Sequence, residues 1–205
     1  MMNPLHIGTS LGRAVWPVTV AMMVTLAAVG CTGETDPGGT TTPLMPSPTG
    51  ELLAVDPVDQ IRGATLYESD GLSVLVPPKW QTKRYENDDY VQILVVSPDD
   101  SRTMVSITIE ATDGDTNTVE VSSQIAFSSA AMGGATNLAQ RPAQWPGWLY
   151  ATAITATADD GNTDVVSLTM LSATHRVIGV VARAPAGTLL DSSAYQSARS
   201  LKETK

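Results

Sequence analysis

Apolar and polar residues alternate through the second half of the chain, and this pattern predicts a series of short β-strands. The clearest strands cover 148–158, 163–173 and 175–182. Asp159-Asp160-Gly161-Asn162 separates the first two, and a tight turn at Thr174 separates the last two. Because such short connections join antiparallel neighbours, the three segments predict a β-meander.

Two hairpins are predicted upstream. Ser69-Asp70-Gly71 separates apolar runs at 64–68 and 72–76, and Asp-Gly between such runs is a strong turn signal. Pro77-Pro78 ends the second run. The second hairpin joins 91–96 to 103–111 through Ser97-Pro98-Asp99-Asp100-Ser101. Residues 51–62 predict an irregular lead-in or a short strand.

Two helices interrupt the strands. The first is predicted over 117–132, with Asn117 as its N-cap, Glu120 completing a capping box, and one apolar stripe, Val121, Ile125 and Met132. A strand over 136–140 and a loop over 141–147 follow. The second helix covers 189–201, and its spacing predicts a buried stripe of Leu190, Ala194, Ala198 and Leu201.

This order of elements predicts an α+β fold for a single domain over 51–205. Strands that follow one another in hairpins and a meander form an antiparallel sheet, and the two helices are expected to flank it.

The beginning of the chain has a different pattern. An apolar run from Ala14 to Gly30 follows Arg13 and leads directly to Cys31, the only cysteine. The junction Leu26-Ala27-Ala28-Val29-Gly30-Cys31 resembles the lipobox recognised by lipoprotein signal peptidase, with Ala28 where Leu is common. We therefore expect residues 1–30 to be a signal peptide, Cys31 to be lipidated, and the protein to be anchored on the extracytoplasmic face of the cell membrane.

Three alternatives to lipidation remain open. The 17 residues from Ala14 to Gly30 are at the short end for a transmembrane anchor, and Pro17 lies among them. Cleavage by ordinary signal peptidase would leave Cys31 as a free thiol. A buried structural cysteine is opposed by the polar residues that follow Cys31 directly.

Residues 31–50 contain mostly Thr, Pro and Gly, with Leu44 and Met45 as their larger apolar side chains. Such a segment buries too little surface to offset the entropy of ordering it, so we expect a disordered tether.

The net charge of the chain limits the classes of partner that it can bind. The formal net charge is −9, and loss of Arg13 with the signal makes it −10. Phosphate backbones are bound by clustered Lys and Arg, so nucleic acid is excluded as a partner. With no second cysteine, the domain also depends on an apolar core and not on disulfides.

The segment Gly71-Leu72-Ser73-Val74-Leu75-Val76-Pro77-Pro78-Lys79-Trp80 resembles the opening of PsbP-like domains and of actinobacterial lipoproteins of the LpqN type. The meander from Trp148 to Arg183 and the closing Ser197-Ala198-Arg199-Ser200-Leu201 extend this resemblance over 64–202. It implies an α/β/α sandwich around an antiparallel sheet, and a non-catalytic role in binding or assembly. Lys79 stands where the family often has Gly.

The chain offers few residues for catalysis. His175 is the only histidine outside the signal segment, and no Gly-x-Ser-x-Gly motif is present. The run Asp113-Gly114-Asp115-Thr116-Asn117 begins like a calcium loop, but Thr118 and Gln124 occupy the positions of the required Gly and Glu. We therefore expect neither catalytic residues nor a metal site, and no cofactor.

Aromatic residues are the candidate binding groups: Trp145, Trp148 and Tyr150, with Trp80 nearby. Exposed loop aromatics commonly anchor partners, and Trp145, between Gln144 and Pro146, is the expected exposed ring. The alternative is that Trp80 and Trp148 fill the ends of the core.

These features together predict an exported, lipid-anchored, non-catalytic binding or scaffolding module of the cell envelope. Its expected partners are the membrane, through Cys31, and an envelope protein or apolar ligand. One alternative is a carrier of a small apolar ligand or lipid. A hydrolase that uses His175 is the other.

Overall fold

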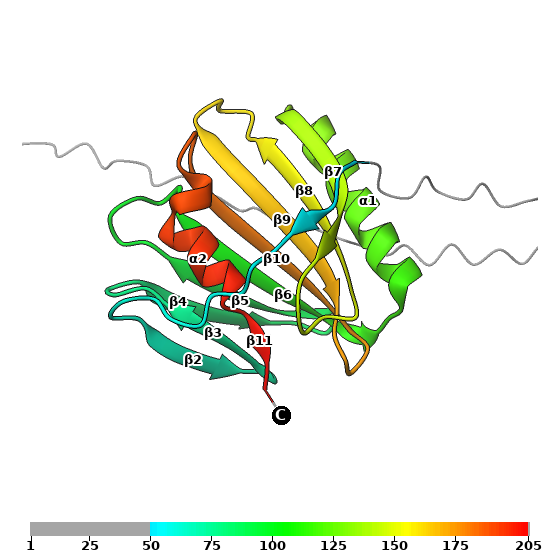
Figure 1. The fold of residues 1–205 in the computed structure, drawn as a ribbon, viewed down its shortest axis with the longest axis horizontal. Helices are drawn as coiled ribbons and strands as arrows, with labels where there is room; N and C mark the ends of the chain where they lie inside the picture. The colour runs from blue at the N-terminus through cyan, green and yellow to red at the C-terminus, as the bar shows by residue number, and fades with distance from the viewer. Residues whose placement is uncertain (1–49, 205) are drawn as a thin grey trace, which may run out of the picture. The chain divides into compact units, whose positions relative to one another are not determined.

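The computed structural model describes residues 50–204. The predicted signal peptide, Cys31 and all of the tether except Gly50 lie outside this part of the chain. The centre of the fold is an eight-stranded sheet, the main sheet (Figure 1). Its strands, in spatial order, are β1 (Leu53–Ala54), β7 (Thr136–Gln144), β8 (Tyr150–Thr157), β9 (Thr163–Leu171), β10 (Arg176–Pro185), β6 (Met104–Asp113), β5 (Tyr90–Val96) and β4 (Gln81–Glu86).

Neighbouring strands of the main sheet are antiparallel except for β1, which runs parallel to β7. The predicted meander is confirmed as β8, β9 and β10, and the second predicted hairpin as β5 and β6. The short strand β1 lies within the predicted lead-in over 51–62.

The first predicted hairpin forms, but in a second, smaller sheet. Strands β2 (Thr65–Ser69), β3 (Leu72–Val76) and β11 (Lys202–Glu203) pair in the order β11-β3-β2. Asp70 and Gly71 have φ values of 53° and 73°, the left-handed conformations that a two-residue hairpin turn with right-handed twist requires. The expectation of one sheet was wrong because the C-terminal residues pair with this hairpin.

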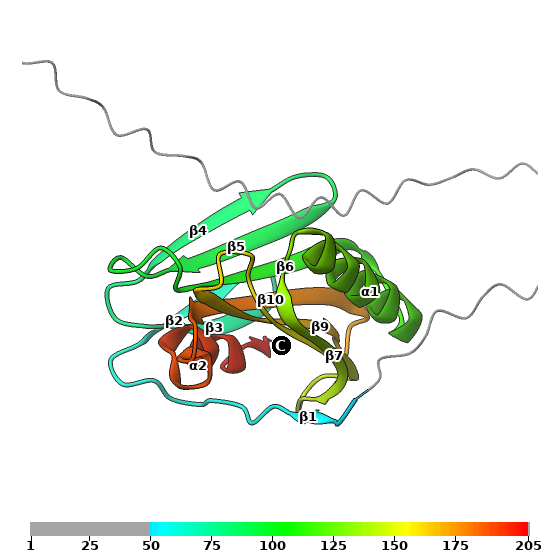
Figure 2. The same ribbon diagram turned by 90° about the horizontal axis from the view of Figure 1, so that it is seen from above.

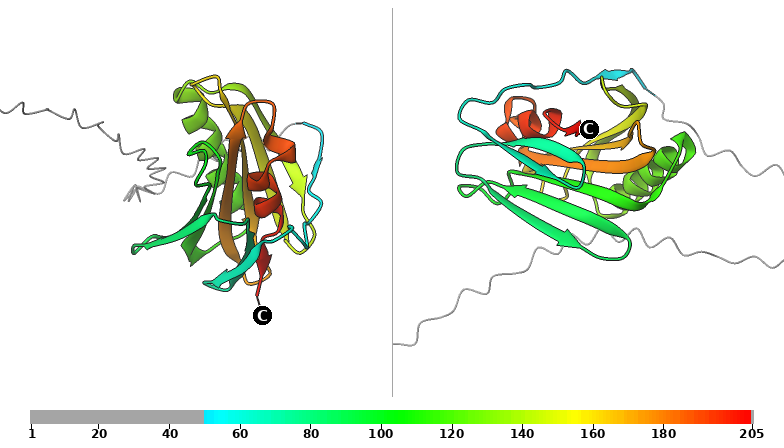
Figure 3. Two further views of the ribbon diagram at one scale, coloured as in Figure 1. Left: turned by 90° about the vertical axis from the view of Figure 1, so that its left-hand side faces the viewer. Right: turned by 90° about the horizontal axis from the view of Figure 1, so that it is seen from below.

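Helices lie on opposite faces of the main sheet. Helix α1 (Thr116–Met132) packs on β7, β8 and β9, whereas α2 (Ser193–Arg199) packs on β10, β6 and β3. Figure 2 shows α1 on one side of the sheet and α2 with the smaller sheet on the other, and both views of Figure 3 agree. The fold is therefore α+β, with helices flanking a largely antiparallel sheet.

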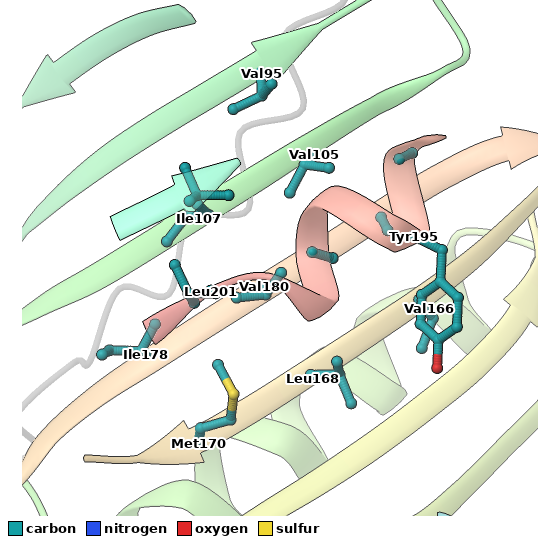
Figure 4. Close-up of a cluster of buried hydrophobic side chains, with 14 of the residues drawn as sticks. Val95, Val105, Ile107, Val166, Leu168, Met170, Ile178, Val180, Tyr195 and Leu201 are labelled. Atoms are coloured by element: carbon teal, nitrogen blue, oxygen red, sulfur yellow. The ribbon is translucent and has the colours of Figure 1, made fainter. Parts of the chain in front are cut away.

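The main core lies between the main sheet, α2 and the smaller sheet. Alternate residues of the central strands point into it, including Ile107, Leu168 and Val180, each 0 % exposed. Figure 4 shows these side chains beneath Tyr195 and Leu201 of the C-terminal segment. Aromatic residues make up only 5 % of the chain, so Leu, Ile and Val supply most of the buried apolar area of this core.

The second predicted helix is interrupted. A short 3-10 helix, η1 (Leu189–Asp191), precedes α2, and Ser192 caps α2 by accepting a hydrogen bond from the Tyr195 N–H. Ala194, Ala198 and Leu201 are buried as predicted, but Leu190 is 72 % exposed. The break at Ser192 turns Leu190 away from the sheet, so the expected four-residue stripe was wrong at that residue.

The first predicted helix begins differently and buries a different stripe. Asp115, and not Asn117, is the N-cap, and Thr118, not Glu120, completes the capping box. The buried residues are Val119, Ser123 and Ala126. The expected stripe of Val121, Ile125 and Met132 is not buried, and Met132 is 83 % exposed. The sheet beneath α1 carries Gln and Thr side chains, so a partly polar stripe packs against it.

Three strand segments were not predicted. β4 is a charged edge strand without apolar alternation, β11 has only two residues, and β7 continues to Gln144 through the predicted loop. Pro142 is tolerated within β7, where it stands opposite Thr152 of β8. These segments form strands because β4 pairs with β5, β11 with β3 and the end of β7 with β1. Their own residues give little sign of a strand.

Lys79 occupies a strained backbone position. Its φ is 69°, in a turn closed by a hydrogen bond from the Trp80 N–H to the Pro77 carbonyl. We expect Lys79→Gly to raise the free energy of unfolding by about 0.5 to 1 kcal/mol, because glycine adopts this φ without steric penalty. Urea denaturation checks this, with Lys83→Gly in β4 as the control that should destabilise. An unchanged or lower stability for Lys79→Gly would contradict the expectation.

Within residues 50–204, no helix has the length and apolar character needed to cross a membrane.

Candidate functional site

The structure places the three predicted binding tryptophans at the main core and Tyr150 on the other face of the main sheet. Trp145 is 3 % exposed and belongs to the main core, so its expected exposure was wrong. Trp148 lies 5.8 Å from it between ring centroids and, like Trp80, is partly buried against that core. Pairing of Val55 with Gln144 places β1 next to the start of this turn, which holds Trp145 inward. The alternative, that Trp80 and Trp148 fill the core ends, agrees with this packing.

Tyr150 lies on the opposite face of the main sheet, beside α1. Its hydroxyl donates a hydrogen bond of 2.8 Å to Glu120 Oε1. Burial and the hydrogen bond to the Glu120 carboxylate raise the pKa of Tyr150 to about 12. Tyr150 therefore ties the first turns of α1 to β8 and does not join the tryptophans.

The other candidate groups also take structural positions. His175 is exposed in the β9–β10 turn with a φ of 62°, and its carbonyl accepts a hydrogen bond from the Gly114 N–H. The Asp113–Asn117 run connects the end of β6 to α1, and Asp115 Oδ1 caps the helix by accepting a hydrogen bond from the Thr118 N–H. Among residues 50–204, no group of three or more His, Cys, Asp or Glu side chains is arranged so that it could hold a metal ion.

A different surface meets the requirements of a binding site. On the α1 side of the main sheet, α1 covers β7 to β9, while β10, β6 and β5 extend beyond it (Figure 2). We call the side chains that these three strands present on this side the open face. Leu94, Ser106 and Val181 form one row across it, and Val96, Met104 and Arg183 form the next. These six residues are only partly buried, so apolar area remains at the surface around one basic side chain.

Gly179 lies in the middle of the open face, opposite Thr108 of β6. A Cβ added at Gly179 would meet only the Thr108 Cβ, at 3.9 Å, which is an ordinary contact. Glycine inside a strand weakens the sheet, and often marks a place where another chain or a ligand approaches closely. The open face is therefore low at its centre and has room for additional atoms.

One flank of α1 borders the open face. Ser122 Oγ donates a hydrogen bond of 3.2 Å to Glu110 Oε1 of β6, which fixes the side of the helix that faces β6. Ile125 follows Ser122 by three residues and therefore lies on the same side. Of the apolar stripe that the sequence predicted to be buried, Ile125 thus borders the open face, whereas Val121 lies nearly opposite the buried side of α1 and Met132 is 83 % exposed at the end of the helix.

Acidic residues gather at one end of the open face. A hydrogen bond from the Ala111 N–H to the Asp89 carbonyl, 2.9 Å long, holds the β4–β5 turn against the end of β6. This brings Asp88 and Asp89 to the end of the sheet where Glu110 and Asp113 lie. None of these four carboxylates forms an ion pair within the described part of the chain. Negative charge therefore lies at the Glu110 end of the open face, and the basic Arg183 lies at the Met104 end.

Burial raises the pKa of Glu110, and the hydrogen bond from Ser122 only partly offsets this effect. Because the folded state binds this proton more tightly than the unfolded chain, the contribution of Glu110 to stability falls as pH rises through the raised pKa. We expect Glu110→Gln to be more stable than the wild type at pH 7. The difference should shrink as pH falls towards 4, in the range of an ordinary glutamate pKa.

Urea denaturation across this pH range measures the effect, with Glu68→Gln on exposed β2 as the control. A Glu110→Gln variant that is less stable than the wild type at pH 7 would contradict a desolvated carboxylate.

Comparison with known proteins gives no match: no family model fits the chain, and no curated protein is significantly similar to it. The site must therefore be interpreted from its own geometry.

Sequence reasoning missed the open face for two reasons. Its residues alternate with core residues along β5, β6 and β10, and alternation alone does not say which face a helix covers. A usable signal was present in Gly179, a glycine inside the apolar run of residues 177–182.

Proposed function

We propose that this chain is an exported, lipid-anchored, non-catalytic binding or scaffolding module of the cell envelope, with the open face as its binding surface. The observation that carries the proposal is partly buried apolar side chains on the α1 side of β10, β6 and β5, beyond the strands on which α1 mainly packs and next to Ile125 of α1. Contiguous apolar surface on a protein often marks an interaction site.

Membrane attachment rests on the sequence around Cys31. A lipid anchor there, followed by a tether, would hold the domain near the membrane and leave the open face accessible. The PsbP-like resemblance supports the same class of function, because that family implies a sheet covered on both faces and a role in binding or assembly. The positions of α1 and α2 on opposite faces are compatible with this assignment.

Lipidation is tested by labelling cells with radioactive palmitate and separating membranes. We expect the wild type to carry label and to sediment with membranes, because acylated Cys31 is the proposed anchor. Cys31→Ala should lose the label and leave the membrane fraction, while the neighbouring Thr32→Ala should behave as the wild type. Equal membrane attachment of Cys31→Ala would overturn the anchor.

Binding at the open face is tested by a photo-crosslinking amino acid placed at Leu94 in the full chain. The matched control is the same amino acid at Leu66, which is 55 % exposed on β2 of the smaller sheet. The proposal expects adducts from position 94 and not from position 66. Absence of any adduct from position 94 would overturn the open face as a binding surface.

A carrier of one apolar ligand is the second candidate, because the same surface would also accept acyl chains. Native mass spectrometry of the purified protein separates the two candidates: a copurified lipid of constant mass favours the carrier.

A further inference from the structure

The dimensions of the open face match those of a helix. Strands in a sheet lie about 4.8 Å apart, so β10, β6 and β5 span about 10 Å, the diameter of a helix with its side chains. From Met104 to Glu110 the face runs along seven residues of β6, or about 20 Å. Because α1 already lies on β7, β8 and β9, a helix beside it would occupy the next position on this sheet.

The chemistry of the surface also fits a helix. Gly179 and Ser106 keep its centre low, which allows a helix backbone to approach closely. Leu94 and Val181 stand on either side of Ser106, and Ile125 of α1 adds apolar contact from the flank. A helix that presents one apolar stripe would bury all three, the mode in which amphipathic helices bind apolar grooves.

Charge defines which helix fits. Asp88, Asp89 and Glu110 lie at one end of the surface, and Arg183 lies in the row at the other end. Lys and Arg side chains on the partner would complement these carboxylates, and so would a helix N-terminus, which carries a partial positive charge. A second copy of this chain fits poorly, because α1 contains no Lys or Arg and α2 contains only Arg199.

We propose that the open face binds one amphipathic helix of another envelope protein, with its apolar stripe on Leu94 and Val181 and its basic N-terminal end at Glu110 and Asp89. This inference rests on the proposed function, since it names the partner of the same surface.

The experiment uses the full lipidated protein in phosphatidylcholine nanodiscs and fluorescent peptides of about 18 residues, roughly five helical turns. The first peptide has an amphipathic Leu stripe with Lys in its first two turns. The second replaces Lys by Glu, and the third keeps the composition of the first but scatters its Leu positions. Fluorescence anisotropy gives each Kd after subtraction of binding to empty discs. We expect the first peptide to bind at least about tenfold more tightly than the other two.

Gly179→Leu should weaken binding of the first peptide about tenfold, because the new side chain fills the floor of the surface. Thr65→Leu adds the same side chain to exposed β2 and should leave Kd unchanged. A double change, Asp88→Asn with Asp89→Asn, should weaken binding about threefold at low salt and have little effect at about 0.5 M salt. If Gly179→Leu does not fold by circular dichroism, Leu94→Glu replaces it.

Equal binding of the Lys and Glu peptides, or wild-type affinity in Gly179→Leu, would overturn the inference. So would a crosslink from position 94 to a lipid or to a second copy of the chain. If position 94 crosslinks to another protein but no peptide binds, the helix inference fails and the proposed function stands. If position 94 gives no adduct, the binding surface itself is refuted.

Discussion

Removing the hydroxyls of Ser197 and Ser200 together is expected to lower the free energy of unfolding by about 3 kcal/mol. The Leu75 N–H of β3 donates a hydrogen bond of 2.8 Å to Ser200 Oγ, and Ser197 Oγ donates one of 2.7 Å to the Leu75 carbonyl. Strand β11 pairs only with Leu72 and Ser73, so these two hydroxyls take the place of a strand partner at Leu75. Ser197 is 0 % exposed and Ser200 4 %, which leaves little access for replacement water.

Urea denaturation followed by tryptophan fluorescence measures the effect of Ser197→Ala with Ser200→Ala. Ser193→Ala, at an exposed position of α2, is the matched control and should be neutral or slightly stabilising, because alanine favours helix. Each single change should lower stability by about 1 to 2 kcal/mol. A double variant within about 0.5 kcal/mol of the wild type would show that the hydroxyls do not hold β3 to α2.

Gly114→Ala is expected to lower the free energy of unfolding by about 2 to 3 kcal/mol through overpacking. A Cβ at Gly114 would clash with Val177 Cγ2 and would lie 3.0 Å from the Thr118 Cβ. Val177 is 0 % exposed and packs with Val119 and Leu171 under α1, so it has little room to move. The β6–α1 connection would have to shift, which would also strain the 2.7 Å hydrogen bond from the Gly114 N–H to the His175 carbonyl.

A double-mutant cycle with Val177→Ala identifies the cause. Removing the Val177 methyl groups should relieve much of the effect of Gly114→Ala, giving a coupling energy of about 1 kcal/mol or more. If the effects of Gly114→Ala and Val177→Ala on stability simply add, the destabilisation arises from the loop backbone and not from a clash with Val177.

Much of the fold could be predicted from local pattern. Alternation located the strands of the meander and of both hairpins, and Asp70-Gly71 forms the predicted turn. Strands without a local signal were missed: charged β4 gains its partner from β5, and β11 gains its partner from β3. Such pairing depends on residues far apart in the chain, which no short window contains.

The candidate site was harder to predict than the fold. The sequence drew attention to Trp145 because tryptophans in loops are common binding anchors, but β1 pairs beside this turn and Trp145 lies in the core. It also predicted that Val121, Ile125 and Met132 would face the sheet. The structure buries Val119, Ser123 and Ala126 in their place, so apolar residues remain available on the outside of α1.

The sequence by itself determined the strands of the meander and of the two hairpins, their turns, the acidic charge and the scarcity of histidine, because each depends on neighbouring residues or on composition. It also predicts the anchor at Cys31. Tertiary structure alone decided which face of each strand is covered. In a sheet, side chains alternate between two faces, and only the positions of α1, α2 and the smaller sheet distinguish the core face from the open face. A helix over three of the strands leaves their neighbours uncovered, and that arrangement creates the proposed binding surface.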